Sequence, residues 1–132
     1  MTGASSRAAL LLALAAGAAC GGSEAKPASS DDGMVAAWKA AKLDVSALTT
    51  VDAKPYGATA CRGGTVAGVD VVLCNYGSGE DAQAAQELGL AAVGDATGAA
   101  LARGDRLLVV IDRRKADPTG RTIDAITAAF RK

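Results

Sequence analysis

The chain has 132 residues, of which 32 are alanine and 16 glycine, so its 50% hydrophobic content overstates the side-chain bulk available for a core. Its formal charge is zero, with 14 basic and 14 acidic residues, and it contains no histidine. This length allows one small domain and excludes a multidomain enzyme. The missing histidine excludes histidine-ligated metal sites and imidazole bases, and the balanced charge gives no electrostatic footprint for nucleic acid.

Residues 1–19 have the features of a secretion signal that is cleaved. Arg7 is their only charged residue, and an apolar run of about 12 residues follows it. That run is too short to cross a bilayer core, which needs about 20 residues, and its length fits a signal-peptide hydrophobic region. Two cleavage sites compete. Ordinary signal peptidase accepts the small residues Ala16 and Ala18, whereas a lipoprotein signal ends directly before Cys20.

The sequence LAAGAAC at residues 14–20, followed by Gly-Gly-Ser, resembles a bacterial lipoprotein signal (type II, lipobox) with its tether. Gly17 departs from the pattern, which usually has leucine three residues before the cysteine. The resemblance implies a diacylglyceryl, palmitate-type modification of Cys20, and firm anchoring needs at least two acyl chains. It also favours the outer membrane, facing the periplasm, because Gly21 rather than aspartate follows the cysteine. Without acylation, we expect a secreted or periplasmic protein, an uncleaved anchor or a cytosolic protein.

Residues 20–33 are expected to form the lipidated cysteine and a flexible tether, because Gly, Ser, Pro and charged residues dominate them. A linker of this composition spans roughly 20 Å. Residues 34–132 then form the single folded domain. That domain resembles small uncharacterised lipoproteins of high-GC Gram-negative bacteria. It contains no motif specific enough to assign a function from this resemblance.

The first predicted elements are a helix and a short strand. The helix covers residues 34–42, with Asp31 or Asp32 as its cap and Val35 and Trp38 on one face. A strand is expected within residues 45–51, which are rich in threonine and valine.

Two runs typical of strands flank Ala67-Gly68 and predict a hairpin. If these two residues form the loop, Val66 lies opposite Val69, and Cys61 lies opposite Cys74. Directly opposed cysteines suit the geometry of a disulfide. The turn and the cysteines therefore predict the same register, and we infer a Cys61–Cys74 bond across the strands.

The remaining elements complete an α+β fold. Ser78 is expected to cap a helix that runs through Glu87 and ends at Gly89. Residues 97–102 are expected to form a weak strand, and residues 106–112 the most apolar strand, at the centre of the sheet. Asp117-Pro118 opens a last helix with an apolar stripe of Ile123, Ile126, Thr127 and Phe130. We therefore predict a small two-layer domain, with an antiparallel sheet of four or five strands and helices packed on one face.

Four basic side chains near the end of the chain are candidates for contact with an anion or an acidic partner: Arg113, Arg114, Lys115 and Arg121. The three adjacent bases, with Arg121 at a helix N-terminus, could form a small phosphate-type site, although a solvated connection after a central strand is the favoured interpretation.

The sequence contains no complete catalytic set. Cys61 and Cys74 lack the close spacing and helix start of a catalytic dithiol, which favours a structural staple over a redox pair. The aspartates at 70, 112, 117 and 124 lack the spacing of a calcium loop. Ser46 and Ser78 have no Ser-x-x-Lys spacing that would supply a base. No metal or cofactor is expected.

The sequence therefore predicts a membrane-anchored envelope lipoprotein that acts as a non-enzymatic binding or structural module with an envelope protein partner. The alternatives are a periplasmic thiol-redox or small-ligand-binding module and, less favoured, a small hydrolase.

Overall fold

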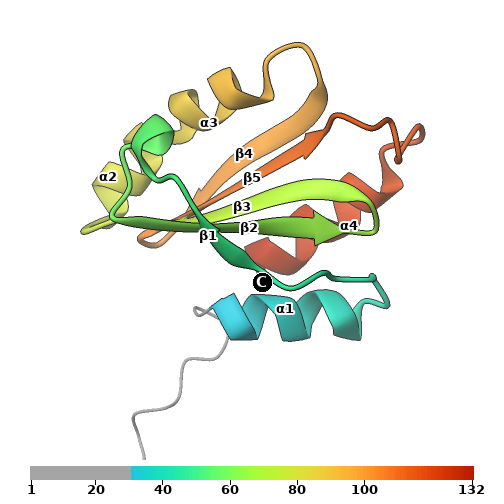
Figure 1. Ribbon diagram of the computed structural model, residues 1–132. Helices are drawn as coiled ribbons and strands as arrows, with labels where there is room; N and C mark the ends of the chain where they lie inside the picture. The colour runs from blue at the N-terminus through green and yellow to red at the C-terminus, as the bar shows by residue number, and fades with distance from the viewer. Residues whose placement is uncertain (1–30) are drawn as a thin grey trace, which may run out of the picture.

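The computed structural model describes residues 31–132, in which five strands form one open antiparallel sheet (Figure 1). The order across the sheet is β1-β2-β3-β5-β4. In chain order the strands are β1 (Thr49–Val51), β2 (Ala60–Val66), β3 (Val69–Asn75), β4 (Thr97–Arg103) and β5 (Arg106–Asp112). The helices are α1 (Asp31–Ala40), the short 3-10 helix η3 (Lys54–Tyr56), α2 (Gly79–Ala84), α3 (Gln86–Val93) and α4 (Arg121–Arg131). The predicted α+β class is confirmed.

The β2–β3 hairpin has the predicted register. Val66 pairs with Val69 and Cys61 pairs with Cys74, with Ala67 and Gly68 as the connecting residues. Both loop residues have a positive φ, 52° at Ala67 and 85° at Gly68, as expected for a two-residue turn that matches the twist of the flanking strands. A sulfur–sulfur bond joins Cys61 to Cys74, and their Cα atoms lie 4.1 Å apart. The cross-strand disulfide is therefore confirmed.

A second hairpin completes the sheet. β4 and β5 pair along their whole lengths, and the turn at Gly104 and Asp105 joins them. β5 also pairs with β3, which places β5 between two neighbours. All seven residues of β5 are buried, as expected for the most apolar strand.

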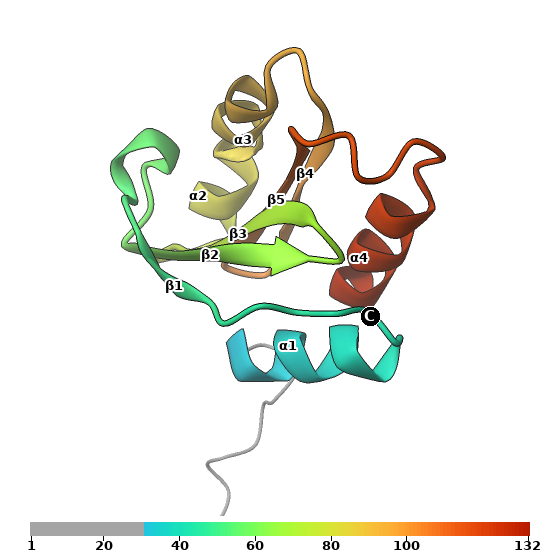
Figure 2. The ribbon, with the colours of Figure 1, turned by 45° about the vertical axis from the view of Figure 1, so that its right-hand side comes forward.

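Helices cover both faces of the sheet, which differs from the expected two-layer arrangement with helices on one face (Figure 2). α1 and α4 pack on one face over Leu108 and Val110, whereas α2 and α3 pack on the other over Leu107 and Val109. The physical reason is that β5 carries large apolar side chains in both directions, so each face of the sheet needs its own cover. The domain consequently has three layers and two apolar cores.

The segment after β3 forms two helices instead of the single one expected. Ser78 does cap the first, because its Oγ accepts a hydrogen bond of 3.1 Å from the N–H of Asp81. α2 ends at Ala84, and α3 then continues past Gly89 to Val93. Gly89 is therefore not a terminating residue. It lies buried within α3, where its missing side chain allows a close approach to β4 and β5.

Candidate functional site

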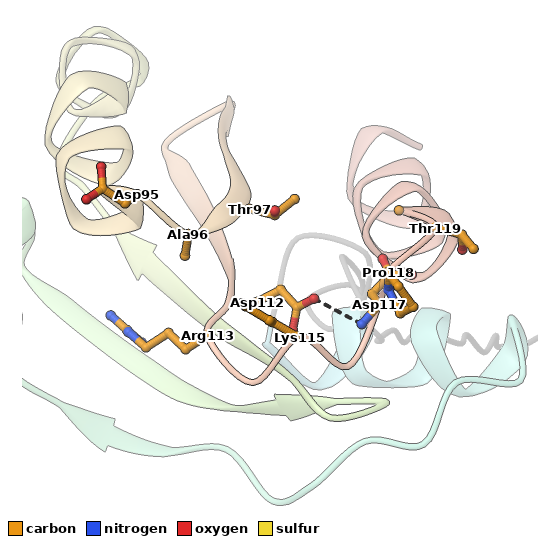
Figure 3. Close-up of a pocket in the computed structure, with 10 residues that line it drawn as sticks. Asp95, Ala96, Thr97, Asp112, Arg113, Lys115, Asp117, Pro118 and Thr119 are labelled. Atoms are coloured by element: carbon orange, nitrogen blue, oxygen red, sulfur yellow. Dashed lines mark hydrogen bonds between the residues drawn. The ribbon is translucent and has the colours of Figure 1, made fainter.

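A cavity of about 510 Å³ lies where β5 ends and the connection to α4 begins (Figure 3). It collects the polar side chains that the sequence singles out at the end of the chain. Its lining residues are Asp95, Ala96, Thr97, Asp112, Arg113, Lys115, Asp117, Pro118, Thr119 and Gly120.

Asp112 uses its carboxylate to fold the loop that follows β5. Oδ1 accepts a hydrogen bond of 2.8 Å from the N–H of Ala116. Oδ2 accepts one of 2.9 Å from the N–H of Asp117, which Figure 3 shows. The side chain is 5% exposed, so these bonds satisfy both oxygens inside the protein. Asp112 therefore fixes the wall of the cavity and is engaged as an acceptor.

Asp117 caps the last helix from a position before its start. Its Oδ2 accepts a hydrogen bond of 2.8 Å from the N–H of Ile123 in the first turn of α4. Burial opposes ionisation of this carboxyl, but backbone N–H groups at the helix start and the Thr119 hydroxyl outweigh that effect and hold its pKa below the usual 3.8. The N-terminus of α4 consequently already has an internal anion.

The four basic residues predicted to contact an anion do not gather at one point. Arg113 and Arg114 both lie near the Asp70 carboxylate, at 3.7 and 3.3 Å. Lys115 lines the cavity together with Arg113, whereas Arg121 is the exposed first residue of α4 and lies outside the lining. Asp70 lies beside the two arginines because β3 pairs with β5. The anion contact stays a prediction.

The disulfide lies in the core under α2 and α3. Cys61 is 1% exposed and Cys74 is fully buried. The same cluster contains Tyr56 and Tyr76, and the Tyr76 hydroxyl donates a hydrogen bond of 2.7 Å to the carbonyl oxygen of Tyr56. Burial raises the pKa of both tyrosines above 10, and the nearby charge of Arg113 offsets part of this effect at Tyr56. The bond is thus enclosed by apolar and aromatic groups.

An ion pair that sequence reasoning missed joins the start of the domain to the sheet. The Arg106 guanidinium binds the Asp31 carboxylate, and Arg62 lies 3.5 Å from the same carboxylate. Arg106 is 4% exposed, and burial lowers its pKa, an effect that Asp31 and Asp105 offset in part. In the sequence, Arg106 stands at the start of an apolar strand, and this position does not indicate which carboxylate it binds.

Within residues 31–132, no three Cys, Asp or Glu side chains come close enough together to hold a metal ion. In the same part of the chain, no helix has both the length and the apolar character needed to cross a membrane. The predicted signal, the lipidation site Cys20 and most of the tether lie outside the described residues.

Comparisons of the chain with protein-family models, with curated proteins and with solved structures found no match.

Proposed function

We propose that the protein is a lipid-anchored envelope lipoprotein whose α+β domain is a non-enzymatic binding or structural module. The observation that carries the proposal is the pairing of Cys61 with Cys74. The chain has three cysteines, so this bond leaves Cys20 with a thiol available for acylation. Disulfides persist in oxidising compartments such as the periplasm, which fits export by the signal-like residues 1–19.

The carboxylates and hydroxyls that were candidates for catalysis are engaged in hydrogen bonds that hold the fold, which favours a binding role over catalysis. Asp112 and Asp117 hold a loop and a helix start through their carboxylates. The two serines considered as nucleophiles are also engaged. Ser78 caps α2, and Ser46 Oγ accepts a hydrogen bond of 2.8 Å from the N–H of Thr65. These groups already have structural partners, so a hydrolase would have to break the contacts that hold its own fold.

Burial also argues against the thiol-redox alternative. A partner thiolate must reach one of the two sulfurs to exchange with a disulfide, and both lie in the core beneath α2 and α3. The reduction potential of Cys61–Cys74 separates the two functions. We expect a value below about −300 mV, typical of structural bonds, and a value near those of oxidoreductases would revive the redox module.

Lipid labelling in a bacterial host tests the anchor. The full chain is expressed with a clickable palmitate analogue, beside Cys20→Ser and a control with Cys61→Ala and Cys74→Ala. We expect label on the wild-type chain and on the control, and none on Cys20→Ser. An unlabelled wild-type chain, or label that survives Cys20→Ser, rejects the lipoprotein proposal.

A further inference from the structure

One surface of the domain combines an exposed leucine with acidic side chains. Leu88 and Leu90 on α3 are 45% and 53% exposed, and they are the exposed large hydrophobic residues of the part of the chain that the structure describes. Leu90 follows Leu88 by two residues and therefore faces a different side of α3. Asp81 and Ala84 line a hollow together with Leu88, and Glu80 and Glu87 are exposed on the same two helices. We call this the α2–α3 surface: Glu80, Asp81, Ala84, Glu87 and Leu88.

A hollow opens next to Leu88 at the edge of this surface. It has a volume of about 340 Å³, and aromatic and small apolar side chains from η3, the end of β3, α2 and α3 contribute to its lining. The hydrogen bond from Tyr76 to the carbonyl oxygen of Tyr56 fixes the two rings relative to each other. The hollow is therefore preformed, and it is large enough to receive an apolar side chain.

All the charged side chains in the stretch of sequence that contains α2 and α3 are negative. No lysine or arginine occurs between Arg62 and Arg103, whereas the α2–α3 surface carries three carboxylates, and Asp95 follows α3. The cations at its borders come from other elements: Lys54 lies on η3, and Arg113, whose charge acts on Tyr56, lines the larger cavity together with Asp95. The surface therefore complements a partner that is apolar at its centre and positively charged around it.

The position of α1 shows which way this surface points relative to the attachment of the chain. α2 and α3 lie on one face of the sheet, and α1 lies across the opposite face (Figures 1 and 2). Asp31, the first described residue, belongs to α1 and binds Arg106. An anchor that joins the domain at this end leaves the α2–α3 surface directed away from it, and anionic lipid would repel the three carboxylates.

We propose that the α2–α3 surface docks a basic segment of another envelope protein. An apolar side chain of that segment enters the hollow beside Leu88, and flanking lysines or arginines pair with Glu80, Asp81 and Glu87. The inference rests on the proposed function for the location of the partner, whereas the docking chemistry rests on the described residues alone.

A short peptide with the core Lys-Lys-Leu-Leu-Lys-Lys serves as the probe. Its binding to the full chain in phosphatidylcholine nanodiscs is measured by fluorescence anisotropy, with empty nanodiscs as the blank. We expect saturable binding that weakens roughly tenfold or more in the Leu88→Ser variant, because the apolar anchor beside the hollow is lost. Leu90→Ser, on another side of α3, should leave the affinity unchanged. Glu80→Gln/Glu87→Gln should weaken binding by about two- to fivefold at low salt, and this difference should shrink at high salt.

Matched controls locate the binding. Lys39→Ser changes an exposed residue of α1, on the opposite face of the sheet, and should leave the affinity unchanged. Peptides with both leucines replaced by serine, or all lysines by glutamate, should not bind. Absence of binding by the wild-type chain, equal binding by Leu88→Ser, or equal weakening by Lys39→Ser overturns the proposal.

Two other occupants of the surface would give different results. Self-association of the wild-type chain that Leu88→Ser abolishes, measured by sedimentation, assigns the surface to a second copy and overturns the proposal. Binding to phosphatidylglycerol vesicles that the same variant abolishes assigns it to lipid and also overturns it. Peptide binding does not depend on the acyl chain, so a failure of palmitate labelling removes the anchor and leaves this result standing.

Discussion

The indole Nε1 of Trp38 donates a hydrogen bond of 3.1 Å to the carbonyl oxygen of Ile126. Trp38 lies on α1 and Ile126 on α4, 88 residues later in the chain, and both are fully buried. The first and last helices of the domain therefore share one interface on the same face of the sheet. Trp38 is therefore a core residue.

Replacement of Trp38 by phenylalanine should lower the free energy of unfolding by about 1 kcal/mol. Phenylalanine keeps most of the apolar contact, but it removes the donor of a buried hydrogen bond. Urea unfolding measures the change, with the exposed Lys39→Gln on the same helix as a control that should stay within about 0.5 kcal/mol of wild type. Equal midpoints for wild type and Trp38→Phe would show that the bond contributes nothing.

The Cys61–Cys74 bond should stabilise the domain by about 3 kcal/mol, because it closes a short loop in the unfolded chain. The two cysteines are 13 residues apart. The Cys61→Ala/Cys74→Ala variant should unfold at a correspondingly lower urea concentration, and wild type with its bond reduced should unfold near the same point. A variant as stable as the oxidised wild-type chain contradicts the assignment of the bond as a staple.

The β2–β3 hairpin could be predicted from the sequence because its determinants are local. A two-residue loop fixes which residues face each other, and the cysteines demand the same register. The capping role of Ser78 and the apolar stripe of α4 are local in the same sense. In each case the interacting groups are close in sequence or repeat with the period of the element that contains them.

The features that the sequence did not predict depend on contacts between distant segments. Asp31 meets Arg106 only because α1 folds back across the sheet. The burial of β5 on both sides was visible in its unbroken apolar run, which is typical of a strand covered on both faces, yet the run does not say which helices cover it. At the candidate site, Arg113 and Arg114 meet Asp70 through the pairing of β3 with β5.

Gly89→Ala should destabilise the domain by about 1 kcal/mol, opposite to the usual gain of about 1 kcal/mol for this change in a helix. A Cβ atom at Gly89 would lie 2.8 Å from the Cβ of Ala100 and 3.0 Å from Cγ2 of Val109, so α3 would have to move away from the sheet. Thermal unfolding measures the effect. Gly77→Ala is the control, because an added Cβ there meets no atom within 4 Å. A gain in stability at position 89 would mean that α3 is not packed as closely as described.

Ala67→Asn should stabilise the hairpin by about 1 kcal/mol. Ala67 has a φ of 52°, a left-handed conformation that costs alanine energy and that asparagine adopts more readily. Gly68→Ala should act in the opposite direction, because its φ is 85° and an added Cβ would lie 3.2 Å from the Cβ of Ala116. Unfolding midpoints of the two variants should therefore lie on opposite sides of the wild-type value. A loss of stability in Ala67→Asn contradicts the turn geometry.

Asp117 should make the stability of the domain depend on acidic pH. Burial alone would raise the pKa of its carboxyl, but hydrogen bonds from Ile123 and its neighbours keep the folded-state pKa below 3.8. A depressed folded-state pKa contributes stability that is fully present above the unfolded value and is lost as the pH falls through the folded value. The contribution should therefore be nearly complete above about pH 5 and be lost progressively as the pH falls below 3.8.

The Asp117→Asn variant isolates this contribution, because the amide keeps the shape of the side chain and lacks the charge. Urea unfolding should show the variant less stable than wild type at neutral pH, with the difference shrinking as the pH falls below 3.8. Asp44→Asn, an exposed position far along the chain from α4, serves as the control for general acid effects. A difference between Asp117→Asn and wild type that stays constant from neutral to strongly acidic pH would show that the ionised carboxylate does not hold the start of α4.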